Sequence, residues 1–145
     1  MTAEERHQKL YFAHLQGMRV SKTFEQKLAE ATDVAKARFD LLTNYLDGIK
    51  KVSARQSKKY LTYRRGRVPV ARLAMRGKTL NLYLSLNPQD YVGTKYKFVD
   101  VSGRKLYKDF GMRIKLTSDR QVRWAKELID NLVVQKGLVF VERGE

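Results

Sequence analysis

The stretch "RLAMRGKTLNLYLSL", Arg72 to Leu86, decides the fold of this chain. Its second half places a leucine at every second position from Leu80 to Leu86. This alternation is typical of a β-strand that buries one face and exposes the other. In the first half, Leu73 and Met75 alternate with Arg72, Ala74 and Arg76. Gly77 lies between the halves at a position typical of a tight turn, so the stretch predicts a β-hairpin.

The segments around this hairpin predict further antiparallel strands. Upstream, "KKYLTYR" (58–64) is joined to the hairpin by a second tight turn at Gly66. Downstream, "KYKFVDVS" (95–102) and "GMRIKLT" (111–117) have the composition of strands, and "NPQDY" (87–91) has that of a turn or a short 3-10 segment. We therefore expect an antiparallel meander of about four to five strands.

A long helix is predicted before these strands. Thr23, followed three residues later by Gln26, has the pattern of a capping box at a helix start. Apolar residues then recur at helical spacing as far as Ile49, which predicts one helix of about 25 residues. The preceding segment, 1–20, is interrupted at Gly17 and predicts only an N-terminal arm or a short helix.

A second helix is predicted near the C-terminus. Ser118 and Gln121 repeat the capping-box pattern, and Gly137 is placed to end the helix. "LVFVE" (138–142) follows as a candidate for a short strand. The predicted class is thus α+β, with a long N-terminal helix, the meander, and a C-terminal helix packed on one sheet face. Residues 21–145 are expected to form a single domain.

The charge of the chain is concentrated in its middle third. The net charge is +15, yet Met1–Asp47 has seven basic and seven acidic residues. Gly48–Gln89 has eleven basic residues and no acidic one, and Asp90–Glu145 has twelve and eight. A field of one sign attracts polyanions and speeds their capture. Solubility alone would not require this concentration, so the distribution favours a polyanionic partner.

The predicted sheet directs its leucines toward the helices and collects basic and aromatic residues on the opposite, open face. Lys and Arg neutralise phosphates, and Tyr can stack on bases. A one-residue slip in the first strand would exchange Tyr60 for Tyr63. The alternative is an ordinary polar face of an antiparallel sheet. The predicted nucleic-acid-binding residues are Lys51, Arg55, Lys58, Lys59, Tyr60, Arg64, Arg65, Arg67, Arg72, Arg76, Lys78, Tyr83, Arg113 and Lys115, with the strongest contact expected where Arg64, Arg65 and Arg67 crowd one turn.

The sequence lacks the residue patterns of common enzymes. It has no Cys, and His7 and His14 have no acidic or thiol partner at the spacing of metal ligands. No phosphate-binding glycine loop or nucleophile motif occurs, and the Asp residues are scattered. We therefore expect no enzymatic activity, no metal or cofactor and no small-molecule substrate. No apolar run approaches the ~20 residues that cross a bilayer, and no secretory signal is recognisable, which predicts a cytoplasmic protein without a membrane role.

Several segments in order resemble an uncharacterised bacterial helix–sheet–helix module. They are "SKTFEQKL", "KKVSARQSKKYLTYRRGRVPVARL", "RGKTLNLYLSLNPQDY", "TKYKFVDVS" and "IKLTSDRQVRWAKELID", and together they span Ser21 to about Leu138. That module has no established activity and no assigned catalytic residues. Its order of elements is distantly similar to double-wing domains, some of which are suspected DNA binders. The resemblance implies a bacterial α+β domain and leaves the function open.

These observations predict a non-enzymatic nucleic-acid-binding protein that contacts the phosphate backbone. RNA and DNA both fit, either alone or within a larger ribonucleoprotein or protein–DNA complex. The alternative is a protein-interaction module, or an accessory or inhibitory subunit, that docks on an acidic surface of a nucleic-acid-handling complex. Both readings depend on the same excess of positive charge.

Overall fold

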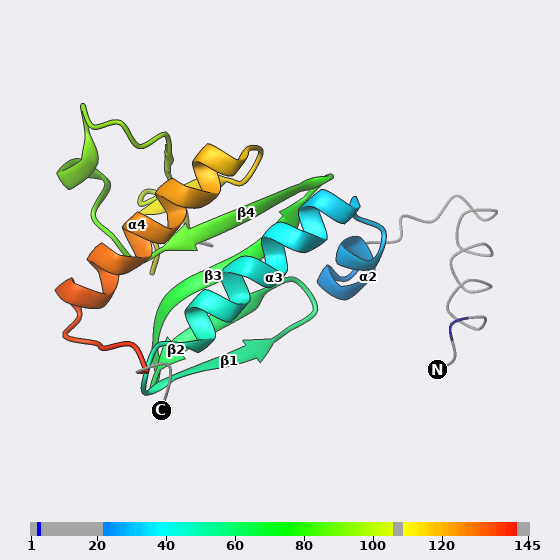
Figure 1. Ribbon diagram of the computed structural model, residues 1–145, viewed down its shortest axis with the longest axis horizontal. Helices are drawn as coiled ribbons and strands as arrows, with labels where there is room; N and C mark the ends of the chain where they lie inside the picture. Colours follow the sequence, from blue (N-terminus) through cyan, green and yellow to red (C-terminus); the bar gives the residue numbers. More distant parts are fainter. Residues whose placement is uncertain (1–2, 4–21, 106–108, 142–145) are drawn as a thin grey trace.

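The computed structural model describes residues 3, 22–105 and 109–141 of the chain (Figure 1). The predicted arm at 1–20 thus lies outside the described residues, except for Ala3. The helical elements are α2 (Phe24–Ala29), α3 (Asp33–Asp47), the 3-10 helix η1 (Pro88–Tyr91) and α4 (Asp119–Gln135). The strands are β1 (Val52–Gln56), β2 (Leu61–Arg65), β3 (Val68–Arg76), β4 (Thr79–Leu84), β5 (Val99–Asp100) and β6 (Met112–Lys115).

The strands form one antiparallel sheet in the order β1-β2-β3-β4-β6-β5. The α+β class and the antiparallel sheet are therefore confirmed, although the sheet has six strands instead of four or five. The predicted meander is wrong beyond β4, because β6 lies between β4 and β5. The strand missed by the sequence is β1, whose side chains are mostly exposed and show no apolar alternation. The predicted turns are present, because Gly66 and Gly77 have φ angles of 60° and 63°.

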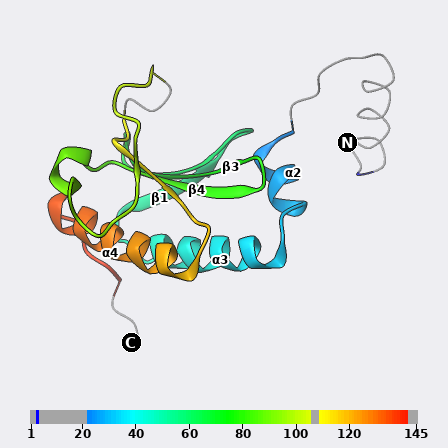
Figure 2. The same ribbon diagram turned by 90° about the horizontal axis from the view of Figure 1, so that it is seen from above.

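Helices α3 and α4 lie side by side on one face of the sheet (Figure 2). The predicted packing of the C-terminal helix on one sheet face is therefore confirmed. The leucines of β4 point toward these helices, as the alternation predicts, and Leu82 pairs with Ile114 of β6 and with Leu73 of β3. All three side chains are at most 1% exposed. Burial of this apolar face is the main force that holds helices and sheet together.

The predicted long helix is wrong in one respect, because it is divided into α2 and α3. Thr32 has extended backbone angles, and its hydroxyl accepts a hydrogen bond from the Ala35 amide at 3.1 Å. A threonine that caps a new helix in this way competes with continuation of the previous one. The break lets α2 fold back, so that Phe24 meets Phe39 of α3 with ring centroids 5.8 Å apart. The predicted capping box of Thr23 and Gln26 is confirmed.

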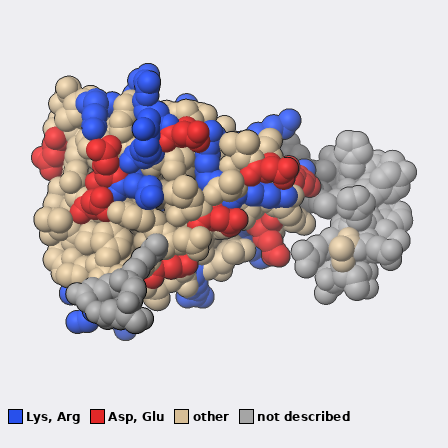
Figure 3. Space-filling model, in the orientation of Figure 1, with Lys and Arg blue, Asp and Glu red and all other residues tan. Residues whose placement is uncertain are grey.

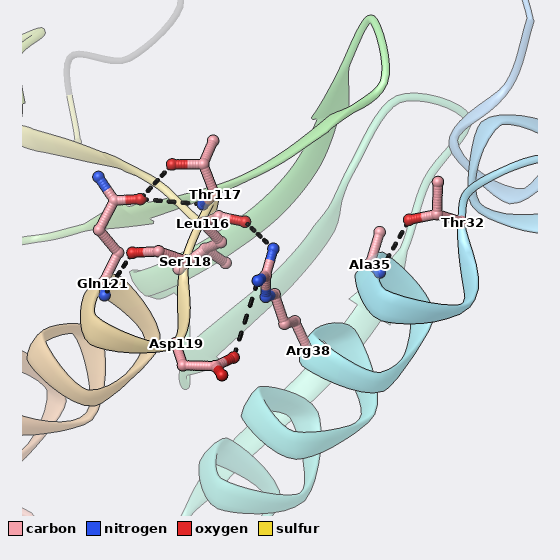
Figure 4. Close-up of polar contacts among 8 residues, drawn as sticks. All are labelled: Thr32, Ala35, Arg38, Leu116, Thr117, Ser118, Asp119 and Gln121. Carbon is pink, nitrogen blue, oxygen red and sulfur yellow. Dashed lines mark hydrogen bonds and ion pairs between the residues drawn. The ribbon is translucent and has the colours of Figure 1, made fainter.

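One arginine ties α3 to the segment before α4 (Figure 4). Arg38 donates from Nη1 to the Leu116 carbonyl at 3.3 Å, and its Nη2 lies 3.7 Å from Asp119. Ser118 caps α4 by accepting from the Gln121 amide, as predicted. These contacts set the position of α4 beside α3 at the point where the chain leaves β6.

The segment after α4 returns to the end of α3. Gly137 has a φ of 65°, which suits its predicted role at the helix end. The predicted C-terminal strand is reduced to an isolated bridge between Ile49 and Phe140. Next to this bridge, the Lys50 amide donates to the Val139 carbonyl at 2.8 Å.

Candidate functional site

A row of polar and aromatic residues crosses the sheet face opposite α3 and α4. The register aligns Arg55 of β1 with Thr62, Arg72, Tyr83, Arg113 and finally Val99 of β5. Side chains at paired positions point to the same face of an antiparallel sheet. The structure therefore places Arg72, Tyr83 and Arg113 on the face that the sequence predicts for them.

The expectation that this face is open around Tyr83 is wrong. Tyr83 is 1% exposed, and it packs in a second small core with Ala74, Val101 and Phe110. The chain after β5 rises on this side of the sheet (Figure 2). The Gly111 amide then bonds to the Leu84 carbonyl at 3.2 Å, which returns the chain to the sheet. Tyr83 is thus covered by its own chain and is not available to stack on a base.

Arg72 and Tyr60 also interact within the protein. The Arg72 guanidinium lies 4.4 Å from the centroid of the Tyr60 ring and 4.9 Å from that of Phe110. Its Nε donates to the Thr62 hydroxyl at 3.1 Å. These contacts are typical of a cation held between aromatic rings, so Arg72 has a structural role on this face.

The sheet separates the other predicted residues into two groups. Arg65 and Arg67 lie at the β2–β3 turn, where Arg65 donates to the Lys136 carbonyl after α4 at 2.9 Å. Lys59 and Arg76 lie at the opposite end of the strands, beside α2.

The predicted binding residues differ in exposure. Most of them are exposed: Lys51, Arg55, Lys58, Lys59, Arg65, Arg67, Arg76, Lys78 and Lys115. Tyr60, Arg64 and Arg72 are half-buried, and Tyr83 and Arg113 are buried.

Two adjoining pockets hollow the face opposite α3 and α4 at the end where Lys59 and Arg76 lie. The larger has a volume of about 630 Å³, and its lining includes the apolar side chains of Tyr60 and Met75 beside the cations. The smaller has a volume of about 390 Å³, and both pockets are lined by Arg76 and Arg104. We call the two together the basic groove. Its cationic residues are Lys22, Lys27, Lys59, Arg76, Arg104, Lys105, Arg113 and Lys115.

The charge of the basic groove is almost uncompensated. Among the described residues, no Asp or Glu lines either pocket. Of the eight cations, Lys22 alone forms an ion pair within the described part of the chain, with Glu30 at 2.5 Å. The surface formed by α3 and α4 differs, because Asp and Glu lie among its Lys and Arg residues (Figure 3). Among the described residues, the basic groove thus gathers positive charge without the acidic residues that accompany it on the helical surface.

Four groove residues are missed by the sequence-based prediction. Lys22 and Lys27 come from the start of the domain, where acidic and basic residues balance. Arg104 and Lys105 come from the connection between β5 and β6. A run of uniform charge in the sequence cannot reveal them, because they meet the other cations only through the fold. The pair "RK" after Gly103 is the one local signal.

Neither a metal cluster nor a membrane span is found in the part of the chain that the structure describes. No three His, Asp or Glu residues within it are grouped as metal ligands. None of its helices is long and apolar enough to cross a bilayer.

No family model, curated protein or solved structure matches this chain. The resemblance to the bacterial helix–sheet–helix module therefore stays a resemblance, and the site has to be interpreted from its own geometry.

Proposed function

We propose that this chain is a non-enzymatic nucleic-acid-binding protein whose basic groove holds the phosphate backbone. The observation that carries the proposal is the gathering of eight cations in a groove without a described carboxylate. They come from α2 and the segment before it, from β3 and β6, and from the β1–β2 and β5–β6 connections. Like charges repel when they are brought together, so their assembly costs stability unless a polyanion compensates it. A phosphate backbone supplies such compensation over the length of the groove.

The shape of the groove fits a nucleic-acid strand better than it fits a flat, acidic surface of a partner protein. Its cations line two adjoining hollows, and Phe24, Tyr60 and Met75 also line the larger one. A nucleic-acid strand combines regularly spaced phosphates with apolar base surfaces, which matches a groove lined by both cations and apolar side chains. RNA and DNA share this chemistry, and both are candidates.

Binding should depend strongly on salt. Fluorescence anisotropy of end-labelled single-stranded and duplex oligonucleotides measures the affinity over a series of salt concentrations. If the groove contacts about four to six phosphates, the logarithm of the association constant should fall with a slope of about −3 to −5 against the logarithm of the salt concentration. A flat response, or no binding at low salt, would contradict the proposal. Capture of an acidic protein in place of nucleic acid would favour the accessory-subunit alternative.

A further inference from the structure

Arg113 of β6 is a buried cation that has no counter-charge among the residues that the structure describes. The residue is 5% exposed, and its buried Nε and Nη1 atoms have no hydrogen-bond acceptor in the described part of the chain. None of the ion pairs among the described residues includes it. Arginine stays protonated in proteins, and a buried charge without a partner lowers stability. An arrangement of this kind is explained if a ligand brings the missing acceptor.

The side chains around Arg113 form a small site for an oxyanion. The smaller pocket of the groove is lined by Arg113, Arg76, Arg104, Lys115, Asn81 and Thr79. Asn81 is 1% exposed, and its side-chain amide donates to the Thr79 carbonyl at 3.1 Å, while its Oδ1 has no donor among the described residues. Four cations and one free acceptor thus line about 390 Å³, with no described carboxylate among them.

We infer that this smaller pocket, the Arg113 pocket, binds a phosphomonoester at the end of a nucleic-acid strand. The inference rests on the proposed function and specifies which part of the strand the groove recognises. A phosphodiester inside a strand has a single charge, and the chain continues from both of its ester oxygens. A terminal phosphate has a charge of about −1.5 to −2 and three free oxygens, so it can enter a pocket where the cation is buried.

The geometry of the groove supports this placement. The Arg113 pocket adjoins the larger hollow, and Arg76 and Arg104 line both. A strand that lies along the larger hollow therefore brings its end to Arg113. The fork of the arginine side chain can give two parallel hydrogen bonds to one phosphate, which a lysine cannot do. The Asn81 Oδ1 atom is an acceptor suited to a hydroxyl on the terminal sugar or to a protonated phosphate oxygen.

The test uses short oligonucleotides of one sequence that carry a 5′-phosphate, a 3′-phosphate or only hydroxyl ends, with the label at the opposite end. One of the phosphorylated forms should bind about tenfold or more tightly than the hydroxyl form, which corresponds to one charge-assisted contact. Arg113→Lys and Arg113→Met should abolish this preference. Arg113→Met should also weaken binding of the hydroxyl form, because Arg113 is one of the groove cations, but by a smaller factor than binding of the phosphorylated form. Lys59→Glu, in the larger hollow, should weaken all forms by a similar factor and keep the preference.

The outcomes separate the inference from the proposed function. Salt-dependent binding with no preference for a phosphorylated end overturns the inference and leaves the proposed function standing. Absence of binding to every oligonucleotide overturns both. Competition by a free mononucleotide as strong as that of the phosphorylated strand contradicts the strand-end assignment. If Arg113→Met fails to fold by circular dichroism, the comparison of the three oligonucleotides with the unaltered protein and with Arg113→Lys still decides.

Discussion

At the residue scale, Tyr63 joins the sheet to the end of α3 through a buried hydroxyl. Its side chain is 2% exposed, and the hydroxyl donates to Asp47 at 3.0 Å. Burial raises the pKa of Tyr63 far above its usual range, and the hydrogen bond and negative charge of Asp47 raise it further. The folded state therefore keeps this proton when the unfolded chain has already lost it.

This pKa shift predicts a loss of stability at alkaline pH. Because the folded pKa is raised, the stabilising effect is complete below the unfolded value of 10.0 and is lost as the pH rises above it. Between about pH 10 and 11 the free energy of unfolding should fall by up to about 1.4 kcal/mol more in the unaltered protein than in Tyr63→Phe. Urea unfolding at several pH values measures how steeply the free energy of unfolding falls with pH in each protein. Equal slopes for the two proteins would show that Tyr63 ionises freely in the folded state.

Gly111 is a second residue whose identity is decided by its surroundings. A Cβ atom at this position would lie 2.1 Å from the Leu86 carbonyl oxygen and 2.7 Å from Cδ of Pro88. Both are rigid groups, since one belongs to the backbone and the other to a proline ring. The chain can therefore pass close to the end of β4 only with glycine at this position.

We expect Gly111→Ala to lower the free energy of unfolding by about 1 to 3 kcal/mol through overpacking. Gly103→Ala is the matched control, because nothing lies within 4 Å of a Cβ atom there. Thermal and urea unfolding of the two variants give the comparison. Similar stability of both variants would mean that the chain at Gly111 can move away from Leu86 at little cost.

At the element scale, the division between α2 and α3 decides where two groove cations lie. Thr32 starts α3 as its N-cap, and the turn before it lets α2 run back toward the β1–β2 connection. The Phe24 amide then donates to the Lys58 carbonyl at 2.6 Å. This contact holds Lys22 and Lys27 beside the groove, which a continuous helix would not do.

Replacement of Thr32 by alanine should lower the free energy of unfolding by about 1 kcal/mol, because the Ala35 amide loses its acceptor. Thr43→Ala is the matched control. Its hydroxyl donates back to the Asp40 carbonyl within α3 at 3.1 Å, a bond that adds little to a helix. Denaturant unfolding distinguishes the two. Equal effects would indicate that the division of the helix is set by packing of Phe24 and not by the cap.

At the scale of the whole molecule, the distribution of charge predicts which surface binds. Arg76 and Lys59 belong to the groove, Arg65 and Arg67 to the β2–β3 turn at the other end of the sheet, and Arg123 and Lys126 to α4. All three pairs have the same charge, so reversal of each pair to Glu changes the net charge equally. Net charge alone would therefore lower the affinity equally.

We expect Lys59→Glu with Arg76→Glu to weaken nucleic-acid binding by about tenfold or more at moderate salt, and to lower the salt slope by about two. The pair Arg65→Glu and Arg67→Glu should have a smaller effect, and Arg123→Glu with Lys126→Glu the smallest, since acidic residues share that surface. Anisotropy at one salt concentration ranks the variants, and circular dichroism confirms that each is folded. If the Arg65→Glu and Arg67→Glu pair loses the most affinity, the binding site lies at the β2–β3 turn, as the charge distribution along the sequence predicts, and not in the groove.

The sequence by itself determined the features that depend on neighbours along the chain. The alternation from Leu80 to Leu86 predicted which face of β4 is buried, because side chains in a strand alternate whatever the rest of the fold does. Thr23 and Ser118 predicted helix starts, because a cap bonds within its own turn. The strand β1 was missed, because an exposed edge strand needs no apolar pattern and is held by its hydrogen bonds to β2.

Only the tertiary structure decided how the charges meet. The sequence indicated an acid-free middle third, but the fold sends Arg67 and Arg76 to opposite ends of β3 and brings Lys22 and Arg104 to the same pocket. It also covers Tyr83 with Phe110 and buries Arg113 without a described acceptor. These outcomes depend on contacts between segments far apart in the chain. Local periodicity and charge counts contain no information on such contacts, because both describe residues that are neighbours in the sequence and not residues that are brought together by the fold.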